Sequence, residues 1–162
     1  MRVGLGYDSH RFDEERALVL GGVEIPDHPG LAGHSDGDAV AHAVIDALLG
    51  GAGLGDIGAH FPDDDERWRD ADSLEMLATA VRRIEGENYQ IVNVDVTVVA
   101  SSPRVRPHAG DMARALAERL RIDPGNVSVR GKSNEGMGWI GRGEGLAVMA
   151  VALLDRIEES DT

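Results

Sequence analysis

A run of nine apolar residues, LAVMAVALL at 146–154, constrains the fold of this chain more than any other segment. The run is far shorter than the roughly 20 residues that a membrane-spanning helix needs. It is better explained as a strand with apolar side chains on both sides, which is typical of strands inside a covered sheet. We therefore expect both faces of this strand to be covered.

Further strands are expected elsewhere in the chain. Residues 2–8 and 17–25 have the composition of short strands, and a charged turn at 13–16 separates them. In residues 91–99, valines alternate with polar side chains, which predicts a strand with one buried face. Another strand is expected around residues 127–129.

Three segments have the signals of helices. The first begins at residue 35 or 36, both good N-cap residues, and stops at residues 50–51, which are glycines. The second begins at residue 72 or 73, has apolar residues at helical spacing and closes at Gly86. The third is expected from Pro107 to about Arg121.

No repeat, low-complexity tract or linker interrupts the 162 residues, so one domain covering residues 1–162 is expected. Its core must consist of Ala, Val, Leu and Ile, because aromatic residues make up only 4% of the chain. The mixture of strands and helices predicts an α+β fold, a two-layer α/β sandwich in which helices pack on one face of a mixed sheet.

The composition excludes several classes of protein. Cysteine is absent, which rules out disulfides, thiolate catalysis and cysteine-based metal sites. A net charge of −13 argues against binding to nucleic acid, whose phosphates would be repelled. With no signal-peptide pattern or membrane-spanning run, a cytoplasmic protein is expected. The only lysine is Lys132, and the Arg-rich, acidic composition fits either an Arg-favouring genome or adaptation to high salt.

Asp8, His10 and His42 form the first candidate site. Residues two apart in an extended segment face the same side, so Asp8 and His10 can converge on one point, and His42 lies on a helix that can pack there. Two histidines and one carboxylate suit Zn²⁺ with an open fourth position. Asp46, one turn after His42, is expected to orient its second ring nitrogen. On spacing alone, hydrogen-bonded structural side chains are the commoner explanation.

Two acidic, Gly-rich segments follow. GHSDGD at 33–38 places His34 and Ser35 at a helix start, where backbone N–H groups favour an anion, although Ser35 also suits a plain cap. In GLGDIGAHFPDDD at 53–65, Asp56 and Asp63 can each bind a pair of sugar or polyol hydroxyls. A simple turn is an equally ordinary explanation of that segment.

The segment GKSNEGMGWIGRGEG at 131–145 lacks the GxxxxGK[ST] spacing of a nucleotide P-loop. Its backbone amides, with Lys132 and Ser133, can nevertheless cradle a diphosphate, and Glu135 can hold Mg²⁺. A flexible loop between two strands accounts for this composition equally well.

Five segments together resemble one family. They are GYDSHRF, LGGVEIP, GLAGHSDGDAVAHAVIDALLGGAGLGDIGAHFPD, NVDVTVVASSPRVRPH and GRGEGLAVMAVALL. Their content, order and spacing resemble 2-C-methyl-D-erythritol 2,4-cyclodiphosphate synthases across essentially the whole chain. The resemblance favours the metal interpretation of Asp8, His10 and His42 over the structural one.

The resemblance implies an enzyme that takes 4-diphosphocytidyl-2-C-methyl-D-erythritol 2-phosphate in the non-mevalonate route to isoprenoid precursors. The substrate's own 2-phosphate attacks its β-phosphorus and CMP leaves, so catalysis consists of positioning and charge stabilisation. The implied cofactors are Zn²⁺ on Asp8, His10 and His42, and Mg²⁺ or Mn²⁺ bound with the diphosphate on Glu135.

The resemblance also implies roles for individual residues. His34 and Ser133 match residues that stabilise the transition state. Asp56 and Gly58 would hold the cytidine ribose, and the backbone of residues 100–106 would read cytosine. The whole implied substrate-binding set, which includes the contacts to methylerythritol phosphate, is Ser35, Asp56, Ile57, Gly58, Phe61, Asp63, Ala100, Pro103, Arg104, Val105, Arg106, Lys132, Asn134, Trp139 and Arg142.

The family's assembly is a homotrimer with active sites between subunits, and the resemblance implies the same here. Tyr7, Trp139 and Arg142 match positions around a central apolar cavity that holds an isoprenoid diphosphate in some members. Tyr7 and Trp139 replace a pair of phenylalanines that is often found there. No nucleic-acid or membrane partner is implied.

Residues 132–134 depart from the family's three threonines and read Lys132, Ser133 and Asn134. Ser133 keeps the hydroxyl, whereas Lys132 places an ammonium group beside the expected α- and β-phosphates, which we expect it to contact. Two other functions fit the residues: a metal-dependent phosphohydrolase that activates water, and a non-catalytic trimer that binds nucleotides or isoprenoid diphosphates.

Overall fold

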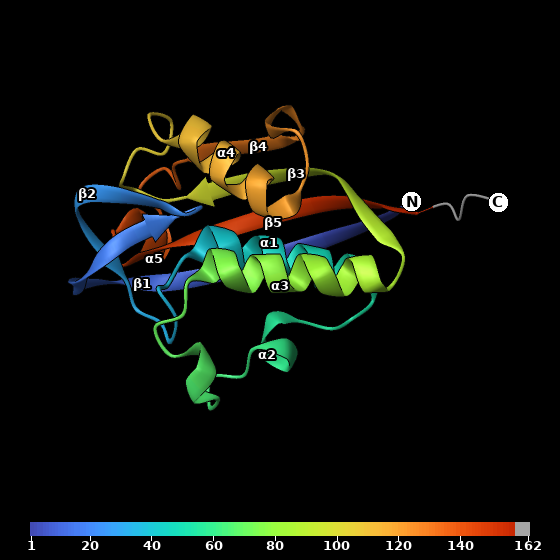
Figure 1. The fold of residues 1–162 in the computed structure, drawn as a ribbon. Coiled ribbons are helices and arrows are strands. Elements are labelled where there is room, and N and C mark those ends of the chain that lie inside the picture. Colours follow the sequence, from blue (N-terminus) through green and yellow to red (C-terminus); the bar gives the residue numbers. More distant parts are fainter. Residues whose placement is uncertain (158–162) are drawn as a thin grey trace, which may run out of the picture.

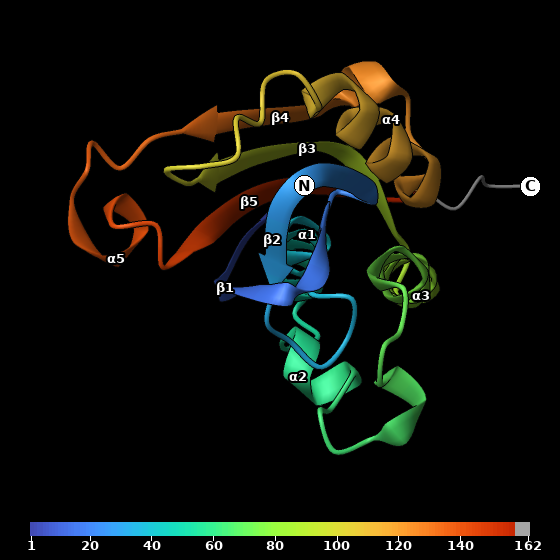
Figure 2. The same cartoon turned by 90° about the vertical axis from the view of Figure 1, so that its left-hand side faces the viewer.

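The computed structural model describes residues 1–157. Its five strands form one sheet in the order β2 (Val23–Leu31), β1 (Arg2–Leu20), β5 (Gly145–Arg156), β3 (Tyr89–Val99) and β4 (Val127–Lys132). The β3–β4 pair is parallel and the other pairs are antiparallel. Three long helices lie on one side of this sheet (Figures 1 and 2). The expected α+β class, with a mixed sheet and helices on one face, is confirmed.

The strands differ from expectation near the N-terminus. The expected strand at 2–8 is the start of a 19-residue strand, β1, which pairs with β5 up to Arg11 and with β2 from Phe12 onward, with a register shift after Asp13. The expected strand at 17–25 was wrong, because it runs across the end of β1, a turn and the start of β2. Residues 13–16 are therefore an irregularity inside a strand, and the turn lies at Gly21 and Gly22, whose φ angles of 58° and 75° favour glycine.

The helix layer contains the three expected helices and two short ones. The helices are α1 (Ala39–Ala52), α2 (Ile57–His60), α3 (Ser73–Gly86), α4 (Ala109–Leu120) and α5 (Gly138–Gly141), with 3-10 turns η1 (Glu66–Trp68) and η2 (Pro124–Asn126). The bounds of α3 agree with the prediction, whereas α4 begins two residues after Pro107. Within residues 1–157, no helix is both long and apolar enough to cross a bilayer.

The start of α1 corrects a second expectation. The N-cap is Asp38 and not residue 35 or 36. The fully buried Asp38 carboxylate accepts hydrogen bonds from the backbone N–H groups of Ala41, Gly21 and Gly22. Asp38 thereby joins the helix start to the β1–β2 turn, a long-range contact that local cap preferences do not reveal.

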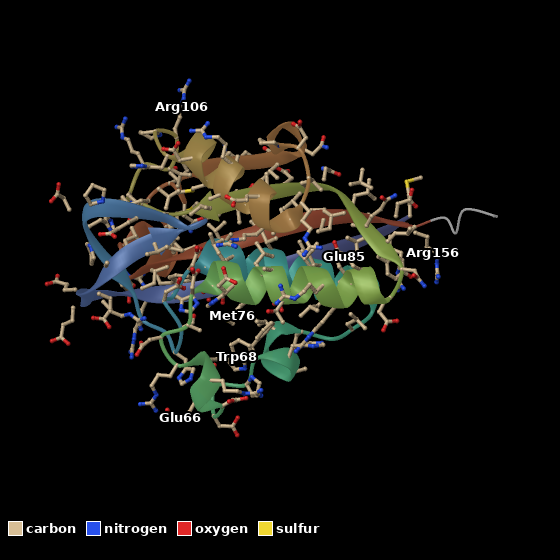
Figure 3. All side chains as sticks on the ribbon, in the orientation of Figure 1. Glu66, Trp68, Met76, Glu85, Arg106 and Arg156 are labelled. Atoms are coloured by element: carbon tan, nitrogen blue, oxygen red, sulfur yellow. The ribbon has the colours of Figure 1, made fainter. Side chains whose placement is uncertain are left out.

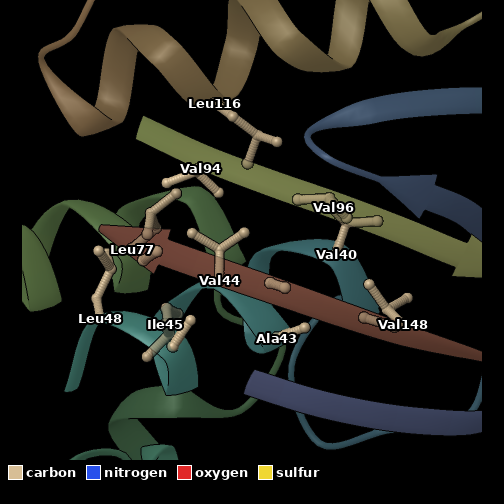
Figure 4. Packing of buried hydrophobic residues seen from close by; sticks show 14 of the residues in the cluster. Val40, Ala43, Val44, Ile45, Leu48, Leu77, Val94, Val96, Leu116 and Val148 are labelled. Atoms are coloured by element: carbon tan, nitrogen blue, oxygen red, sulfur yellow. The ribbon is translucent and has the colours of Figure 1, made fainter. Parts of the chain in front are cut away.

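The core lies between β5 and the helices. Leu146, Val148, Ala150, Ala152 and Leu154 of β5 are fully buried against α1 and its neighbours, and Figure 4 shows Val148 beside Val40 of α1. On the other face of β5, Met149 and Val151 are 43% and 42% exposed. Within one chain, only one face of this strand is covered, contrary to the expectation for residues 146–154.

Glycines bring β1 and α1 into direct backbone contact. A Cβ atom on Gly4 would lie 1.8 Å from the carbonyl oxygen of Ala47, and one on Gly6 would lie 1.8 Å from that of Ala43. Such distances are impossible for any larger residue, so α1 can approach β1 this closely only because both positions are glycine. The next residues on the same face of β1 are Asp8 and His10.

Candidate metal centre and active site

Three possible metal ligands converge between β1 and α1. Asp8 and His10 follow Gly4 and Gly6 on the strand face that α1 covers, and His42 lies in the first turn of α1. The Asp8 Oδ2 atom is 2.7 Å from His10 Nε2 and 3.2 Å from His42 Nδ1. Their ligand atoms all lie within 4.8 Å of one another. The structure thus brings together the three residues that the sequence analysis singled out.

The charges of this cluster depend on one another. Burial alone raises the pKa of Asp8, but the neighbouring rings of His10 and His42 outweigh it and hold that pKa below its usual 3.8. Burial alone lowers the pKa of His10, but its hydrogen bond to Asp8 outweighs burial and raises the pKa above 6.5. In the metal-free protein, the cluster therefore favours a carboxylate beside a protonated imidazole.

Each histidine is held by a second partner. The Nδ1–H group of His10 donates to the carbonyl oxygen of Ala32, which leaves Nε2 facing Asp8. His42 Nε2 lies 3.0 Å from Ser35 Oγ and 2.9 Å from Ser73 Oγ. Asp46 does not orient His42 as expected, because its carboxylate accepts the backbone N–H of Ile57 at 2.8 Å.

The three residues could hold a metal ion, and their donor set can be compared with that of zinc sites. Zinc ligands lie roughly 2.0–2.2 Å from the metal, which in a tetrahedral site places them about 3.3 Å from each other. The two separations from Asp8 Oδ2, 2.7 and 3.2 Å, are close to this value. The donor set, two ring nitrogens and one carboxylate oxygen, is also one that zinc accepts with an open position for a substrate.

A pocket of about 260 Å³ opens beside the three ligands. His34 lies in its wall, and the His34 Nε2 atom is buried without a hydrogen-bond partner among residues 1–157. Trp68 and Met76 also line it, and the sequence analysis missed both (Figure 3). The remaining lining residues are Asp8, His10, Gly33, Ser35, His42, Ile57, Gly58, Phe61 and Asp63.

The sequence contains weak indications that Trp68 and Met76 line a pocket. Trp68 is one of only two tryptophans and lies in an acidic loop, where a large apolar ring needs a partner. It packs edge-on against Phe61, with ring centroids 4.8 Å apart. Met76 is on the buried face of α3. These side chains give the pocket an apolar wall opposite its polar one.

A second pocket, of about 290 Å³, lies where β3 and β4 end. The backbone N–H of Ala100 donates to the carbonyl oxygen of Lys132 at 3.0 Å, which ties the loop after β3 to β4. Arg104, Arg106 and Lys132 line this pocket, and no carboxylate does. In a chain of net charge −13, such a grouping of cations favours an anionic ligand. The other lining residues are Val98, Ala100, Ser101, Pro103, Val105, Gly131 and Ser133.

Comparison with known proteins identifies the family. A model described as the YgbB family matches residues 1–155. The chain belongs to the YgbB family. The family resemblance expected from the sequence is thereby confirmed.

Several relatives of this YgbB-family chain are similar over nearly their whole length. A 2-C-methyl-D-erythritol 2,4-cyclodiphosphate synthase of Rubrobacter xylanophilus is 56% identical over 96% of this chain and 95% of its own. The synthase of Neisseria gonorrhoeae is 51% identical over 97% and 98%. A bifunctional enzyme IspD/IspF of Anaeromyxobacter is 52% identical over 96% of this chain, which spans only 40% of that longer protein.

Solved structures agree with the fold. The bifunctional IspDF of Campylobacter jejuni superimposes with a TM-score of 0.92 at 39% identity, over 96% of this chain and 42% of that one. A CDP complex of IspF from Plasmodium falciparum gives 0.84 at 36% identity, over 97% of both chains.

The remaining candidate residues of this YgbB-family chain lie away from the three ligands. Asp56 caps α2 and accepts the backbone N–H of Ala59. Glu135 is exposed, with a φ of 52°, and accepts a hydrogen bond from the Ser133 hydroxyl at 2.8 Å. The side-chain amide of Asn134 donates to the carbonyl of Met137. Among residues 1–157, the cluster of possible metal ligands comprises Asp8, His10 and His42 without Glu135.

The pocket beside Asp8 and the pocket beside Lys132 are therefore separate within one chain. The lining of the pocket beside Asp8 shares no residue with that of the pocket beside Lys132. Figure 3 shows the same separation, with Arg106 at one end of the view and Trp68 and Met76 far from it. Trp139, on α5, is 39% exposed, and Arg142 pairs with Glu144.

Proposed function

We propose that this chain converts 4-diphosphocytidyl-2-C-methyl-D-erythritol 2-phosphate to 2-C-methyl-D-erythritol 2,4-cyclodiphosphate and releases CMP, in the non-mevalonate route to isoprenoid precursors. The observation that carries the proposal is the convergence of Asp8, His10 and His42 at a pocket wall. Its second support is the shared name of relatives that match this chain along their whole length.

Asp8, His10 and His42 would hold Zn²⁺, and Glu135 would hold Mg²⁺ or Mn²⁺ together with the diphosphate. Bound there, the metals would neutralise phosphate charge and polarise a phosphate oxygen. The chain's own contribution is to fix the two rings: the carbonyl of Ala32 and the hydroxyls of Ser35 and Ser73 hold the ring nitrogens that face away from Asp8.

The reaction needs no protein nucleophile. An oxygen of the substrate's 2-phosphate forms a bond to the β-phosphorus, and the bond from that phosphorus to the oxygen bridging the α-phosphate breaks. The leaving oxygen departs on CMP, so no water enters either product. The chain therefore has to position two anionic groups and stabilise their combined charge.

Several side chains are suited to these tasks. His34 presents a buried, unpartnered ring nitrogen at the pocket wall, from which it would stabilise phosphate charge together with Ser133. Arg104, Arg106 and Lys132 would bind the nucleotide phosphates, while the backbone of residues 100–106 would read cytosine. His34, Ser35 and Asp63 would face the methylerythritol phosphate, while Asp56 and Gly58 would hold the cytidine ribose.

We also propose that the active form is a homotrimer, because the substrate must reach both pockets at once. The pocket beside Asp8 in one subunit would meet the pocket beside Lys132 in the next. The outer face of the sheet exposes Val3 at 67%, Leu5 at 68% and Tyr7 at 54%, a large apolar area for a single chain. This face would line the central cavity for an isoprenoid diphosphate, together with Trp139 and Arg142. Residence in the cytoplasm stays a prediction.

The test is release of CMP from the cytidyl substrate with and without a metal chelator. We expect release without chelator, and its loss after chelation or in Asp8→Asn, which replaces a ligand oxygen. Asp13→Asn is the matched control, because Asp13 lies on the same strand and accepts only the backbone N–H of Glu15. Full CMP release from chelated protein or from Asp8→Asn would contradict the proposal.

A further inference from the structure

Behind the metal ligands, a chain of polar contacts runs from half-buried Asp36 through buried Ser73 to His42. The Ser73 hydroxyl lies 2.9 Å from His42 Nε2 and donates a short hydrogen bond to Asp36 Oδ1. The backbone N–H of Ser73 donates to Asp36 Oδ2 at 3.1 Å. Ser73 is fully buried and is the first residue of α3. Three separate segments therefore meet at this one hydroxyl.

The direction of these hydrogen bonds determines where the His42 proton lies. Both carboxylate oxygens of Asp36 accept from Ser73, one from its backbone N–H and the other from its hydroxyl, so the single Ser73 hydroxyl proton points to Asp36. The Ser73 oxygen can then only accept from His42, which requires a hydrogen on Nε2 of that ring. In the neutral ring, Nδ1 is left with its lone pair. This is the nitrogen that faces Asp8 Oδ2 at 3.2 Å.

We infer that Asp36 and Ser73 are positioning residues that hold neutral His42 in the tautomer with hydrogen on Nε2 and Nδ1 free to bind a metal. The inference rests on the proposed function, in which His42 is a metal ligand. Neither residue would touch the metal or the substrate. Their effect passes through the orientation and basicity of the His42 ring, as is usual for partners of ligating histidines.

Two other neighbours of His42, Asp46 and Ser35, do not fix its tautomer. The Asp46 carboxylate is engaged by the backbone N–H of Ile57. Ser35 Oγ lies 3.0 Å from His42 Nε2, but the other protein atoms within reach of this hydroxyl are Ser73 Oγ at 3.3 Å and the N–H of Gly37 at 3.4 Å. With no carboxylate to take its proton, the Ser35 hydroxyl can donate or accept and so fits either tautomer.

The tautomer can be measured in the metal-free protein by the ¹⁵N chemical shifts of the histidine rings, at a pH where the rings are neutral. The His42 signals are assigned by their loss in His42→Gln. We expect wild-type His42 to carry hydrogen predominantly on Nε2. In Ser73→Ala and Asp36→Asn we expect the population with hydrogen on Nδ1 to rise, because Asp8 then competes for the proton. Asp72→Asn, with the same charge change at the same helix start, should leave the tautomer unchanged.

Zinc affinity, measured by competition with a chelator, gives the second readout. We expect Ser73→Ala and Asp36→Asn to weaken Zn²⁺ binding by about 10- to 100-fold, with Asp72→Asn at the wild-type value. The inference is overturned if wild-type His42 carries its hydrogen on Nδ1, or if both variants keep the wild-type tautomer and Zn²⁺ affinity. If the tautomer shifts as expected while wild-type protein neither binds Zn²⁺ nor releases CMP, the positioning stands and the proposed function fails.

Discussion

At the scale of single residues, the site depends on where protons lie. His10 and His42 each use one ring nitrogen for a fixed partner in the chain and present the other to Asp8. Asp8 stays ionised despite burial because the two rings surround it. A metal that binds this cluster replaces a proton that the cluster holds. Metal affinity therefore depends on pH.

Zinc binding should weaken as pH falls. The His10 pKa is raised above 6.5, so the metal displaces a proton from His10 at any pH below that raised value. We expect the apparent affinity to fall about tenfold per pH unit there, measured by chelator competition between about pH 8 and pH 5. The same affinity throughout that range would contradict this account.

In the metal-free protein, the effect of pH on folding stability through His10 is opposite to its effect on zinc affinity. The His10–Asp8 pair stabilises the folded protein fully below the unfolded His pKa of about 6.5, and this contribution is lost as pH rises through the raised folded pKa. At the acid end it is lost as pH falls through the lowered Asp8 pKa, below 3.8. The thermal stability gained on adding Zn²⁺ should consequently grow with pH.

Lys132 is the residue that departs most from the family pattern, and it lines the pocket with Arg104 and Arg106. We expect Lys132→Thr to raise KM for the cytidyl substrate by about 3- to 10-fold, since a charged hydrogen bond contributes about 1.5–3 kcal/mol and exposure reduces this. Arg114→Thr, which removes an exposed cation paired with Asp111 on α4, is the control. Unchanged KM and kcat in Lys132→Thr would show that Lys132 faces solvent without a role.

At the scale of elements, the sequence was informative where the pattern was local. Period-two valines predicted β3, and helical spacing with Asp72 predicted α3. The extent of β1 and the start of α1 were predicted wrongly because both depend on Asp38 binding the distant turn at Gly21 and Gly22.

The candidate site likewise has features that local sequence patterns predict and features that they do not. The convergence of Asp8, His10 and His42 was predictable, because alternation in a strand and a helical position place them on facing surfaces. Spacing alone did not favour a metal over structural side chains; the family resemblance did. The contact of Ser73 with His42 was not predictable, since it joins segments 31 residues apart through a packing arrangement that no local pattern encodes. Trp68 was missed for a similar reason: its partner Phe61 lies across a loop.

The close packing of β1 on α1 gives a prediction about these elements. We expect Gly6→Ala to destabilise the protein by about 3 kcal/mol or more, because the new Cβ would overlap the Ala43 carbonyl and push α1 away. The same shift would separate His42 from Asp8 and weaken Zn²⁺ binding. Gly50→Ala is the control: apart from its chain neighbours and the backbone of α1, no atom of residues 1–157 lies within 4 Å of its Cβ position, so we expect a gain of about 0.5–1 kcal/mol. Chemical denaturation measures both, and a Gly6→Ala protein of wild-type stability would refute the packing argument.

At the scale of the whole molecule, a single chain leaves one face of the sheet uncovered. The nine apolar residues at 146–154 predicted a strand covered on both sides, yet Met149 and Val151 are exposed beside Leu5 and Tyr7 of β1. The proposed trimer would cover this face and would also unite the two separate pockets. Both features point to an assembly whose interface and active site depend on each other.

A charge introduced on this face should therefore change both the oligomeric state and the activity. We expect Leu5→Lys to lower the molecular mass in sedimentation from that of a trimer to that of a monomer, because an unpaired charge buried in an interface costs about 3–5 kcal/mol. CMP release should fall in parallel. Glu118→Gln makes the same charge change on exposed α4 and should alter neither. A Leu5→Lys protein that remains trimeric, or a fully active monomer, would contradict the shared-site arrangement.

The most direct test of the central claim is the reaction in ¹⁸O-labelled water, followed by mass spectrometry of both products. Intramolecular attack predicts CMP and a cyclic diphosphate that contain no solvent oxygen, formed only when metal is present. One ¹⁸O atom in either product would show that water is the nucleophile and that the chain is a phosphohydrolase.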